Sequence, residues 1–202
     1  MSIRFVYLAS GSPRRRELLQ QMGVPYQVVD VDVDEGSLPT EMPDAYVSRL
    51  AAAKATAGWL ATRSSAAARL RPAPVLGADT AVVLGDEILG KPSDRDHGDR
   101  MLSQLSGRTH RVLTAVALRS ESGLDLRVSS SDVTFRRIEE RERIAYWDTG
   151  EPAGKAGAYA IQGFAAAFVA ELRGSYSGVM GLPIFETAEL LDAADVPRWR
   201  RA

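Results

Sequence analysis

The stretch Phe5–Leu19, FVYLASGSPRRRELL, predicts a strand, a tight loop and a helix in immediate succession. Ser12 is a favourable N-cap, and Pro13 suits the first helical position because the N–H that proline lacks has no partner there. Arg14–Arg16 then fall in the first helical turn, where the helix dipole disfavours each cation by about 0.3–1 kcal/mol. Free N–H groups and three guanidinium groups at one place indicate an anion site, and phosphate is the usual anion. A basic surface patch or a Ser-Pro phosphorylation target is the alternative.

The overall composition is typical of a globular protein without a general affinity for polyanions. The 202 residues are 45% hydrophobic and 25% charged, and the formal net charge is −1. We therefore expect neither nucleic acid nor a membrane as a partner, and any anion site must be local. The absence of cysteine excludes disulfides, thiolate metal ligands and thiol catalysis, and it agrees with a reducing compartment. With no signal-peptide or membrane-spanning pattern either, we expect a cytoplasmic protein.

Residues 26–34, YQVVDVDVD, alternate apolar and acidic side chains with a period of two, which predicts a half-buried strand. Asp30, Asp32 and Asp34 share one face of this strand. Three acids on one face are usually no more than a solvated surface. Near an arginine cluster, however, one of them could hold a divalent metal.

The next helix is expected to begin near Pro43, with Val47, Leu50 and Ala51 in its apolar stripe. Lys54 falls where this period requires another apolar residue. Two interpretations follow: Lys54 either lies at the edge of the stripe with its ammonium group in water, or it points into a cleft.

A buried strand is predicted over residues 75–84, VLGADTAVVL, which is apolar except for Asp79 and Thr80. A carboxylate in such a run is costly unless it is paired, hydrogen-bonded or bound to metal. Asp79 is therefore a candidate catalytic acid or base, and a structural aspartate that accepts backbone N–H groups is the alternative. A hairpin turn at Gly85–Asp86 sets Thr80 opposite Lys91. Strict alternation then places Lys91 and Asp79 on different faces and leaves open whether they share a site.

The second half of the chain alternates helices, strands and glycine-rich loops. Neither His97 nor His110 has metal-ligand spacing, so carboxylates are left to perform any acid–base chemistry. The segment 61–74 is expected to be a helix end and spacer, and the basic tail over about 196–202 is expected to fray. The remaining expected elements are helices near 93–107, 139–148 and 184–194, strands over 110–118, 126–135 and 164–172, and loops over 151–163 and 174–183.

Six motifs, in order from residue 8 to residue 183, resemble the Maf family: LASGSPRRRELL, GADT, GKP, LSGRTH, EPAGKAGAYAIQG and GSYSGVMGLP. The resemblance implies one domain over residues 1–202 with an α/β fold. That fold is elongated, with a long twisted mixed sheet flanked by helices and two lobes around a central cleft, similar to inosine triphosphate pyrophosphatases. It also implies hydrolysis of a nucleoside triphosphate to the monophosphate and pyrophosphate, with a divalent cation, Mg²⁺ before Mn²⁺ or Co²⁺. A homodimer follows by analogy.

The same resemblance implies roles for particular residues. The catalytic proton acceptor falls on Asp79, and Glu35, the residue after the acidic run, is expected to hold the metal together with Asp79. Arg14, Thr80 and Gln162 match the branch that prefers dTTP and UTP, not the 7-methyl-GTP branch. The Gln162 amide offers a donor and an acceptor side by side, which match N3–H and O4 of uracil or thymine. The implied substrate-binding residues are Ser10, Arg14, Arg15, Glu35, Lys54, Thr80, Lys91 and Gln162.

An alternative function is a nucleotide-sensing regulator of cell division or septum formation with little turnover. Such a protein would keep the arginines and lysines but would not need Asp79. The intact GADT motif around Asp79 therefore favours the enzyme.

Overall fold

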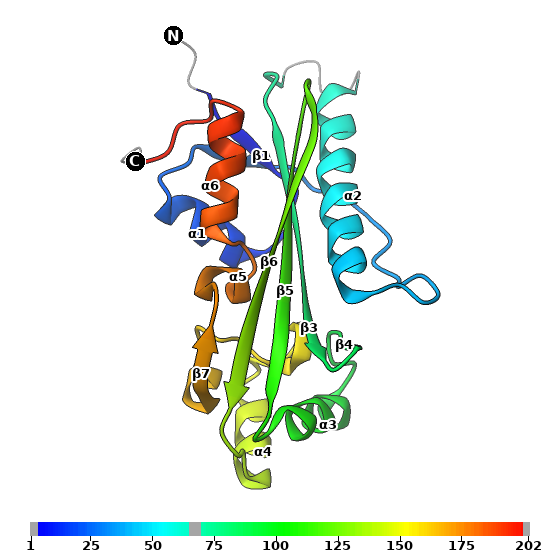
Figure 1. Cartoon of the computed structure of the whole chain (residues 1–202), viewed down its shortest axis with the longest axis vertical. Coiled ribbons are helices and arrows are strands. Elements are labelled where there is room, and N and C mark those ends of the chain that lie inside the picture. Colours follow the sequence, from blue (N-terminus) through cyan, green and yellow to red (C-terminus); the bar gives the residue numbers. More distant parts are fainter. Residues whose placement is uncertain (1–3, 65–69, 200–202) are drawn as a thin grey trace.

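The computed structural model describes residues 4–64 and 70–199, which form a seven-stranded mixed sheet covered by helices (Figure 1). This confirms the expected α/β class. The strand order is β2-β1-β3-β5-β6-β7, and β4 pairs with β3. β1 is parallel to β2 and β3, and the other pairs are antiparallel. The bounds are β1 (Val6–Leu8), β2 (Tyr26–Val28), β3 (Val75–Leu84), β4 (Glu87–Leu89), β5 (Thr109–Ser120), β6 (Gly123–Phe135) and β7 (Val169–Arg173).

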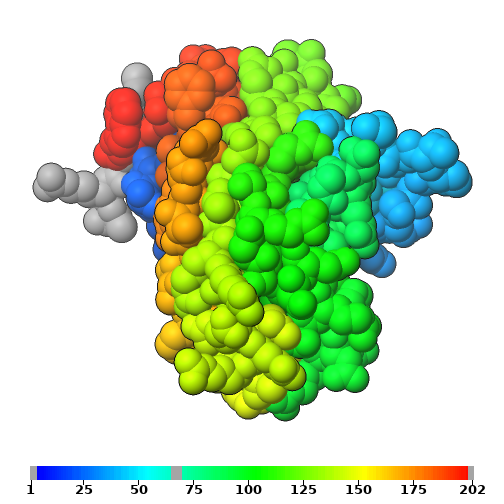
Figure 2. Space-filling model, turned by 60° about the horizontal axis from the view of Figure 1, so that its bottom comes forward, coloured from blue at the N-terminus to red at the C-terminus, as the bar shows by residue number. Residues whose placement is uncertain are grey.

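Helices cover both faces of the sheet and one of its ends. In Figure 1, α2 lies on one side of the long strands β5 and β6, α1 and α6 lie on the other side, and α3 and α4 lie at the bottom. Figure 2 looks toward that end, where α4 in yellow-green lies beside the green segment that contains α3. Within the described ranges, no helix is long and apolar enough to cross a membrane. The bounds are α1 (Pro13–Gln21), α2 (Pro43–Arg63), α3 (Arg95–Leu105), α4 (Glu140–Asp148), α5 (Tyr176–Met180), α6 (Ile184–Ala193) and the 3-10 helices η2 (Ala156–Ala158) and η3 (Phe164–Phe168).

The core consists of four hydrophobic clusters in the described residues, two of them larger than the others. One large cluster contains Leu8 of β1, Leu19 of α1 and Leu190 of α6, and the other contains Leu102 of α3 and Tyr146 of α4. Both large clusters include residues of β3 and β5, so these two strands connect them.

β3 changes its neighbour along one edge. Val75 and Leu76 pair with β1, whereas the last residues, from Val82 to Leu84, pair with β4. The opposite edge pairs with β5 from Val75 to Val83. Between Leu76 and Val82, the edge that faces β1 and β4 therefore has no strand partner in the described part of the chain, and the sheet is open there.

Helix α2 approaches β3 closely because small residues line the contact. A Cβ atom at Gly77 would lie 2.5 Å from both Ala51 O and Ala55 N, so a glycine is needed where the strand backbone meets the helix backbone. At Gly58 a Cβ atom would lie 2.8 Å from the Val75 side chain. This close approach places the helix segment that includes Lys54 beside β3.

The elements with the strongest local pattern lie where the sequence predicts them. β3 occupies residues 75–84, α2 begins at Pro43, and the last helix occupies Ile184–Ala193, so these three predictions are confirmed. The predicted strand over 26–34 is wrong after Val28, where β2 ends. β1, its only ladder partner, ends at Leu8 and leaves no strand backbone for the later residues to pair with. The predicted alternation still shows in the burial of residues 29–34, since Val29, Val31 and Val33 are half-buried and the aspartates between and after them are exposed.

The hairpin after β3 is confirmed, because Leu84 pairs with Glu87. The predicted pairing of Thr80 with Lys91 is wrong, since the ladder between β3 and β4 ends at Val82 and Leu89. Lys91 therefore lies beyond the strand, and the alternation of sheet faces does not constrain its side chain.

Three predictions in the C-terminal third are wrong. In the predicted strand over 164–172, the first five residues form η3, and β7 begins only at Val169. The predicted loop over 174–183 contains α5, whose N-cap Ser175 accepts a hydrogen bond from Gly178 N. The tail does not fray before Trp199, whose N–H donates to Met22 O. Residues 65–69 of the predicted spacer and residues 200–202 of the tail lie outside the described residues.

Replacement of Gly77 by alanine is expected to destabilise the protein by about 1–3 kcal/mol, the usual cost of overpacking, because the α2 backbone cannot move aside as a flexible side chain does. In a chain of this size that lowers the midpoint of thermal unfolding by about 2–12 °C. Gly90→Ala is the matched control, since a Cβ atom there meets nothing within 4 Å. Equal melting temperatures for the two variants would contradict this account of the helix–strand contact.

Candidate active site

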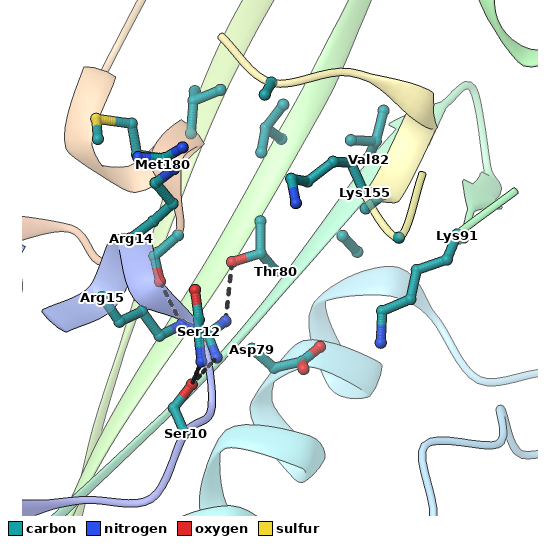
Figure 3. A pocket seen from close by; sticks show the side chains of 18 of the residues that line it. Ser10, Ser12, Arg14, Arg15, Asp79, Thr80, Val82, Lys91, Lys155 and Met180 are labelled. Atoms are coloured by element: carbon teal, nitrogen blue, oxygen red, sulfur yellow. Dashed lines mark hydrogen bonds between the residues drawn. The ribbon is translucent and has the colours of Figure 1, made fainter. Parts of the chain in front are cut away.

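A cleft of about 750 Å³ lies at the gap in the edge of β3 (Figure 3). Its walls come from segments far apart in the sequence: the loop after β1, the start of α1, the segment after β2, α2, β3, β4 and the segment after it, β5, residues 154–162 and α5. All the predicted substrate-binding and catalytic residues line this cleft: Ser10, Arg14, Arg15, Glu35, Lys54, Asp79, Thr80, Lys91 and Gln162.

Lys54 links two carboxylates in this cleft. Its Nζ lies 2.7 Å from Asp79 Oδ1 and 2.6 Å from Glu35 Oε1. The Lys54 and Asp79 side chains are only 12% and 10% exposed, so the ammonium group is the partner that a carboxylate in a buried strand needs. The structure agrees with the second interpretation of Lys54, in which the side chain points into a cleft. Asp79 Oδ2 accepts no hydrogen bond from the described residues, which leaves this oxygen available to a ligand or to water.

Glu35 extends the same ionic contact to Lys91. Its Oε2 lies 3.0 Å from Lys91 Nζ, and its backbone oxygen accepts a hydrogen bond from the Tyr46 hydroxyl at 3.0 Å. Hydrogen bonds from Lys54 and Lys91 lower the pKa of Glu35 to about 2, although partial burial opposes this shift. Glu35 is therefore ionised at neutral pH. Lys91 and Asp79 therefore lie at the same site, because Lys91 contacts Glu35, and Lys54 contacts both Glu35 and Asp79. This arrangement needs no bulge in the hairpin.

Arg15 connects three parts of the cleft wall. Its Nε donates to Gly181 O at 2.8 Å, and its terminal nitrogens donate to Ser10 Oγ at 3.0 Å and to Thr80 Oγ1 at 3.4 Å (Figure 3). Burial lowers the pKa of Arg15, and nearby carboxylates act against that shift. These bonds use three of the five N–H donors of a guanidinium group. Arg15 thus joins the wall together and keeps donors for a ligand.

The other residues of the predicted anion site lie differently. Arg14 lines the cleft and forms an exposed ion pair with Glu17, at 2.8 Å, which water screens. Arg16 does not line the cleft. Ser12 precedes α1 and Pro13 begins it, as predicted, but the Ser12 side chain makes no capping hydrogen bond.

Apolar side chains line another part of the cleft. Figure 3 shows Val82 and Met180 on the far side of Thr80 from Asp79. Thr80 Oγ1 lies within hydrogen-bond distance of Thr114 Oγ1, at 3.0 Å. Among the apolar lining residues are Val82, Val112, Tyr159, Ala160, Ile161, Val179 and Met180.

The sequence analysis missed Lys155, whose side chain points into the cleft in Figure 3. Within the described ranges it forms no ion pair. The available signal was its position as the only charged residue in residues 152–163. With Lys155, cations outnumber carboxylates along the cleft: the cations are Arg14, Arg15, Lys54, Lys91 and Lys155, and the carboxylates are Asp30, Glu35 and Asp79.

The donor set fits a magnesium ion whose coordination is completed by a phosphate ligand. Residues 4–64 and 70–199 contain no group of three or more His, Cys, Asp and Glu side chains that could hold a metal. Mg²⁺, however, is usually bound by one or two carboxylates together with water and substrate phosphates. Glu35 and Asp79 supply two carboxylates on one cleft. His110 is buried against the Tyr159 hydroxyl, and burial lowers its pKa to about 4, so it is not part of this donor set.

Among solved structures, the Ham1 protein of Staphylococcus aureus matches with a TM-score of 0.38 and 15% sequence identity. The match covers 68% of this chain and 73% of that protein.

The sequence relatives are much more similar. The dTTP/UTP pyrophosphatase of Saccharophagus degradans is 54% identical over 96% of this chain and 91% of its own length. The dTTP/UTP pyrophosphatase of Alkalilimnicola ehrlichii is 54% identical, over 95% of this chain and 93% of its own length. The profile of Maf-like proteins matches residues 5–194. Because these matches extend over nearly the whole length, the chain belongs to the family of Maf-like proteins.

Proposed function

We propose that this protein hydrolyses dTTP and UTP to the nucleoside monophosphate and pyrophosphate. Relatives more than half identical to the chain bear the name dTTP/UTP pyrophosphatase. The observation that carries the proposal is Asp79, a carboxylate held by Lys54 in a cleft where cations predominate. We also propose that the protein acts in the cytoplasm, where nucleotide pools are used, and as a homodimer.

In the proposed reaction, water attacks the α-phosphorus, and the bond from that phosphorus to the α,β-bridging oxygen breaks. Asp79 is the base: its Oδ2, free of other donors in the described residues, accepts the proton of the attacking water. Lys54 holds Oδ1 at 2.7 Å and so fixes the direction of the carboxylate. Pyrophosphate leaves with the electron pair of the broken bond.

The cations of the cleft neutralise the triphosphate and the departing pyrophosphate. Preorganised charge of this kind is usually the largest contribution to phosphoryl-transfer catalysis. We assign phosphate binding to Ser10, Arg14, Arg15, Lys54 and Lys91, which line one continuous cleft. A Mg²⁺ ion bound by Glu35 and Asp79 would supply further charge neutralisation at the phosphate oxygens.

Base recognition is assigned to the apolar part of the cleft. The Gln162 amide can pair with O4 and N3–H of a pyrimidine, and Thr80 separates this part from Asp79 (Figure 3). Arg14 is the third residue assigned to substrate preference.

Pyrophosphate release with a panel of nucleoside triphosphates and Mg²⁺ tests the proposed activity. We expect release from dTTP and UTP, much less from 7-methyl-GTP, and loss of release when EDTA removes the metal. Release from no triphosphate would support a nucleotide sensor instead. Release from 7-methyl-GTP but not from dTTP or UTP would refute the assignment of Arg14, Thr80 and Gln162.

Asp79→Asn is expected to lower kcat by about 10²–10⁴-fold, the usual contribution of a general base, because an amide cannot accept the proton. Nucleotide binding, measured by calorimetry, should persist, since the cations remain. Asp86→Asn is the matched control: it makes the same change at the exposed turn of the same hairpin. Comparable activity of the Asp79 and Asp86 variants would remove Asp79 from its assigned role.

Glu35→Gln is expected to destabilise the protein in a pH-dependent way. The folded-state pKa of about 2 lies below the ordinary value of 4.5, so the ionic contacts of Glu35 stabilise the fold above about pH 4.5 and are lost as the pH falls toward 2. The difference in free energy of unfolding between wild type and variant, from urea titrations, should therefore narrow between pH 5 and pH 3. Glu87→Gln, at an exposed strand residue, should show no such trend. A constant difference over this range would contradict the assigned contacts.

A further inference from the structure

Gln162 depends on its backbone for its orientation. It lies between η2 and η3, in a segment that belongs to no strand of the described sheet. Its side chain lines the cleft, yet the amide makes no hydrogen bond to any described residue. Because the amide has no hydrogen-bond partner among the described residues, its position depends strongly on the backbone that carries it. The position of the amide therefore depends on the contacts that hold the backbone of residues 160–165.

Two side chains outside the cleft bind this segment at both of its ends. Tyr146 of α4 donates its hydroxyl to Glu151 Oε1 at 2.7 Å and accepts a hydrogen bond from Ala160 N at 3.3 Å. Glu151 accepts from Phe164 N at 2.9 Å and from Ala165 N at 3.2 Å. The Tyr146–Glu151 pair thus holds the backbone two residues before Gln162 and two residues after it.

The packing around this pair leaves little freedom. Tyr146 is 4% exposed and its ring meets Phe168 edge to face, with centroids 5.2 Å apart. Burial and the hydrogen bond to Glu151 raise the pKa of Tyr146, so the hydroxyl keeps its proton and can act as donor and acceptor together. A Cβ atom at Gly163 would collide with the Glu151 carboxylate, which shows how closely that carboxylate fits the segment.

The chain just before this segment contacts the side of the cleft assigned to phosphate. Gly157 N, in η2, donates to Gly90 O at 3.0 Å, next to Lys91. The backbone that leads to Gln162 is therefore held near Lys91 as well as at α4.

We propose that Tyr146 and Glu151 are positioning residues for base recognition, which hold the Gln162 amide where it meets the pyrimidine edge. This inference rests on the proposed function. Neither side chain lines the cleft, so both act through Gln162 and not on the substrate. Without the pair, residues 160–165 lose three hydrogen bonds to backbone N–H groups, and the backbone of Gln162 is no longer held at both ends.

The test measures base preference by binding, independently of turnover. Calorimetry compares the α,β-imido analogues of UTP and of 3-methyl-UTP, which cannot be cleaved at the reacting bond; the 3-methyl group removes the N3–H donor. Tyr146→Phe is expected to lower the wild-type preference for the uridine analogue by about 2- to 12-fold, the value of one neutral hydrogen bond. Affinity for tripolyphosphate, which has no base, should stay unchanged.

A double-mutant cycle separates positioning from a general structural effect. In a Gln162→Ala background, Tyr146→Phe should cause no further loss of preference. Tyr176→Phe is the matched control, because the Tyr176 side chain is half-exposed and its hydroxyl makes no hydrogen bond to the described residues. Glu151→Gln replaces Tyr146→Phe if the latter does not fold, with the same expected loss.

Three outcomes overturn the inference. In the first, the wild type binds both analogues equally, and in the second, the Tyr146→Phe variant keeps the wild-type preference for the uridine analogue. The third outcome is that Tyr146→Phe lowers this preference equally in the presence and in the absence of the Gln162 side chain. Pyrophosphate release from UTP is measured on the same wild-type preparation. Base-dependent binding without release would refute the proposed hydrolysis and leave the positioning role supported. Release of pyrophosphate, together with an unchanged base preference in the Tyr146→Phe variant, would support the proposed hydrolysis and refute the positioning role.

Discussion

The rest of the site depends on one ammonium group, Lys54 Nζ, which contacts the carboxylates of Asp79 and Glu35. A carboxylate in the middle of a buried strand requires such a partner, because an unpaired buried charge costs several kcal/mol. The partner reaches β3 only because α2 lies against the strand at Gly77, where a side chain of any size would meet the α2 backbone. A packing constraint two residues from Asp79 thus sets the geometry of the charged centre.

The position of the cleft follows from the sheet. β3 loses β1 as a neighbour after Leu76 and gains β4 only at Val82, so the intervening edge is open. Ser10 follows the end of β1, and Glu35 follows β2, so the segments after two parallel strands meet at that opening. This agrees with the general rule that ligands bind beyond the carboxyl ends of parallel strands, where neighbouring strands diverge.

The sequence predicts the parts of the site that depend on local pattern. An acid inside an apolar strand and a lysine on an apolar helix stripe mark Asp79 and Lys54, and the structure brings both to one cleft. The predicted pairing of Lys91 with Thr80 is wrong because counting outward from a turn assumes that both strands continue, whereas β4 ends at Leu89. The length of β2 and the 3-10 character of η3 depend on distant partners, which no local pattern contains. For the same reason, the contacts of Arg15 with Gly181 and Thr80 were not predictable.

The charges of the cleft partly offset one another. Cations gathered in one cleft repel one another, and the carboxylate of Glu35 offsets this by pairing with Lys54 and Lys91 at once. The carboxylates are fewer than the cations, so a net positive charge remains to attract an anion. Under the proposed function, an entering triphosphate would exchange partners with these groups. Charges that are already in place need little reorganisation, and that is the condition under which they stabilise a transition state most effectively.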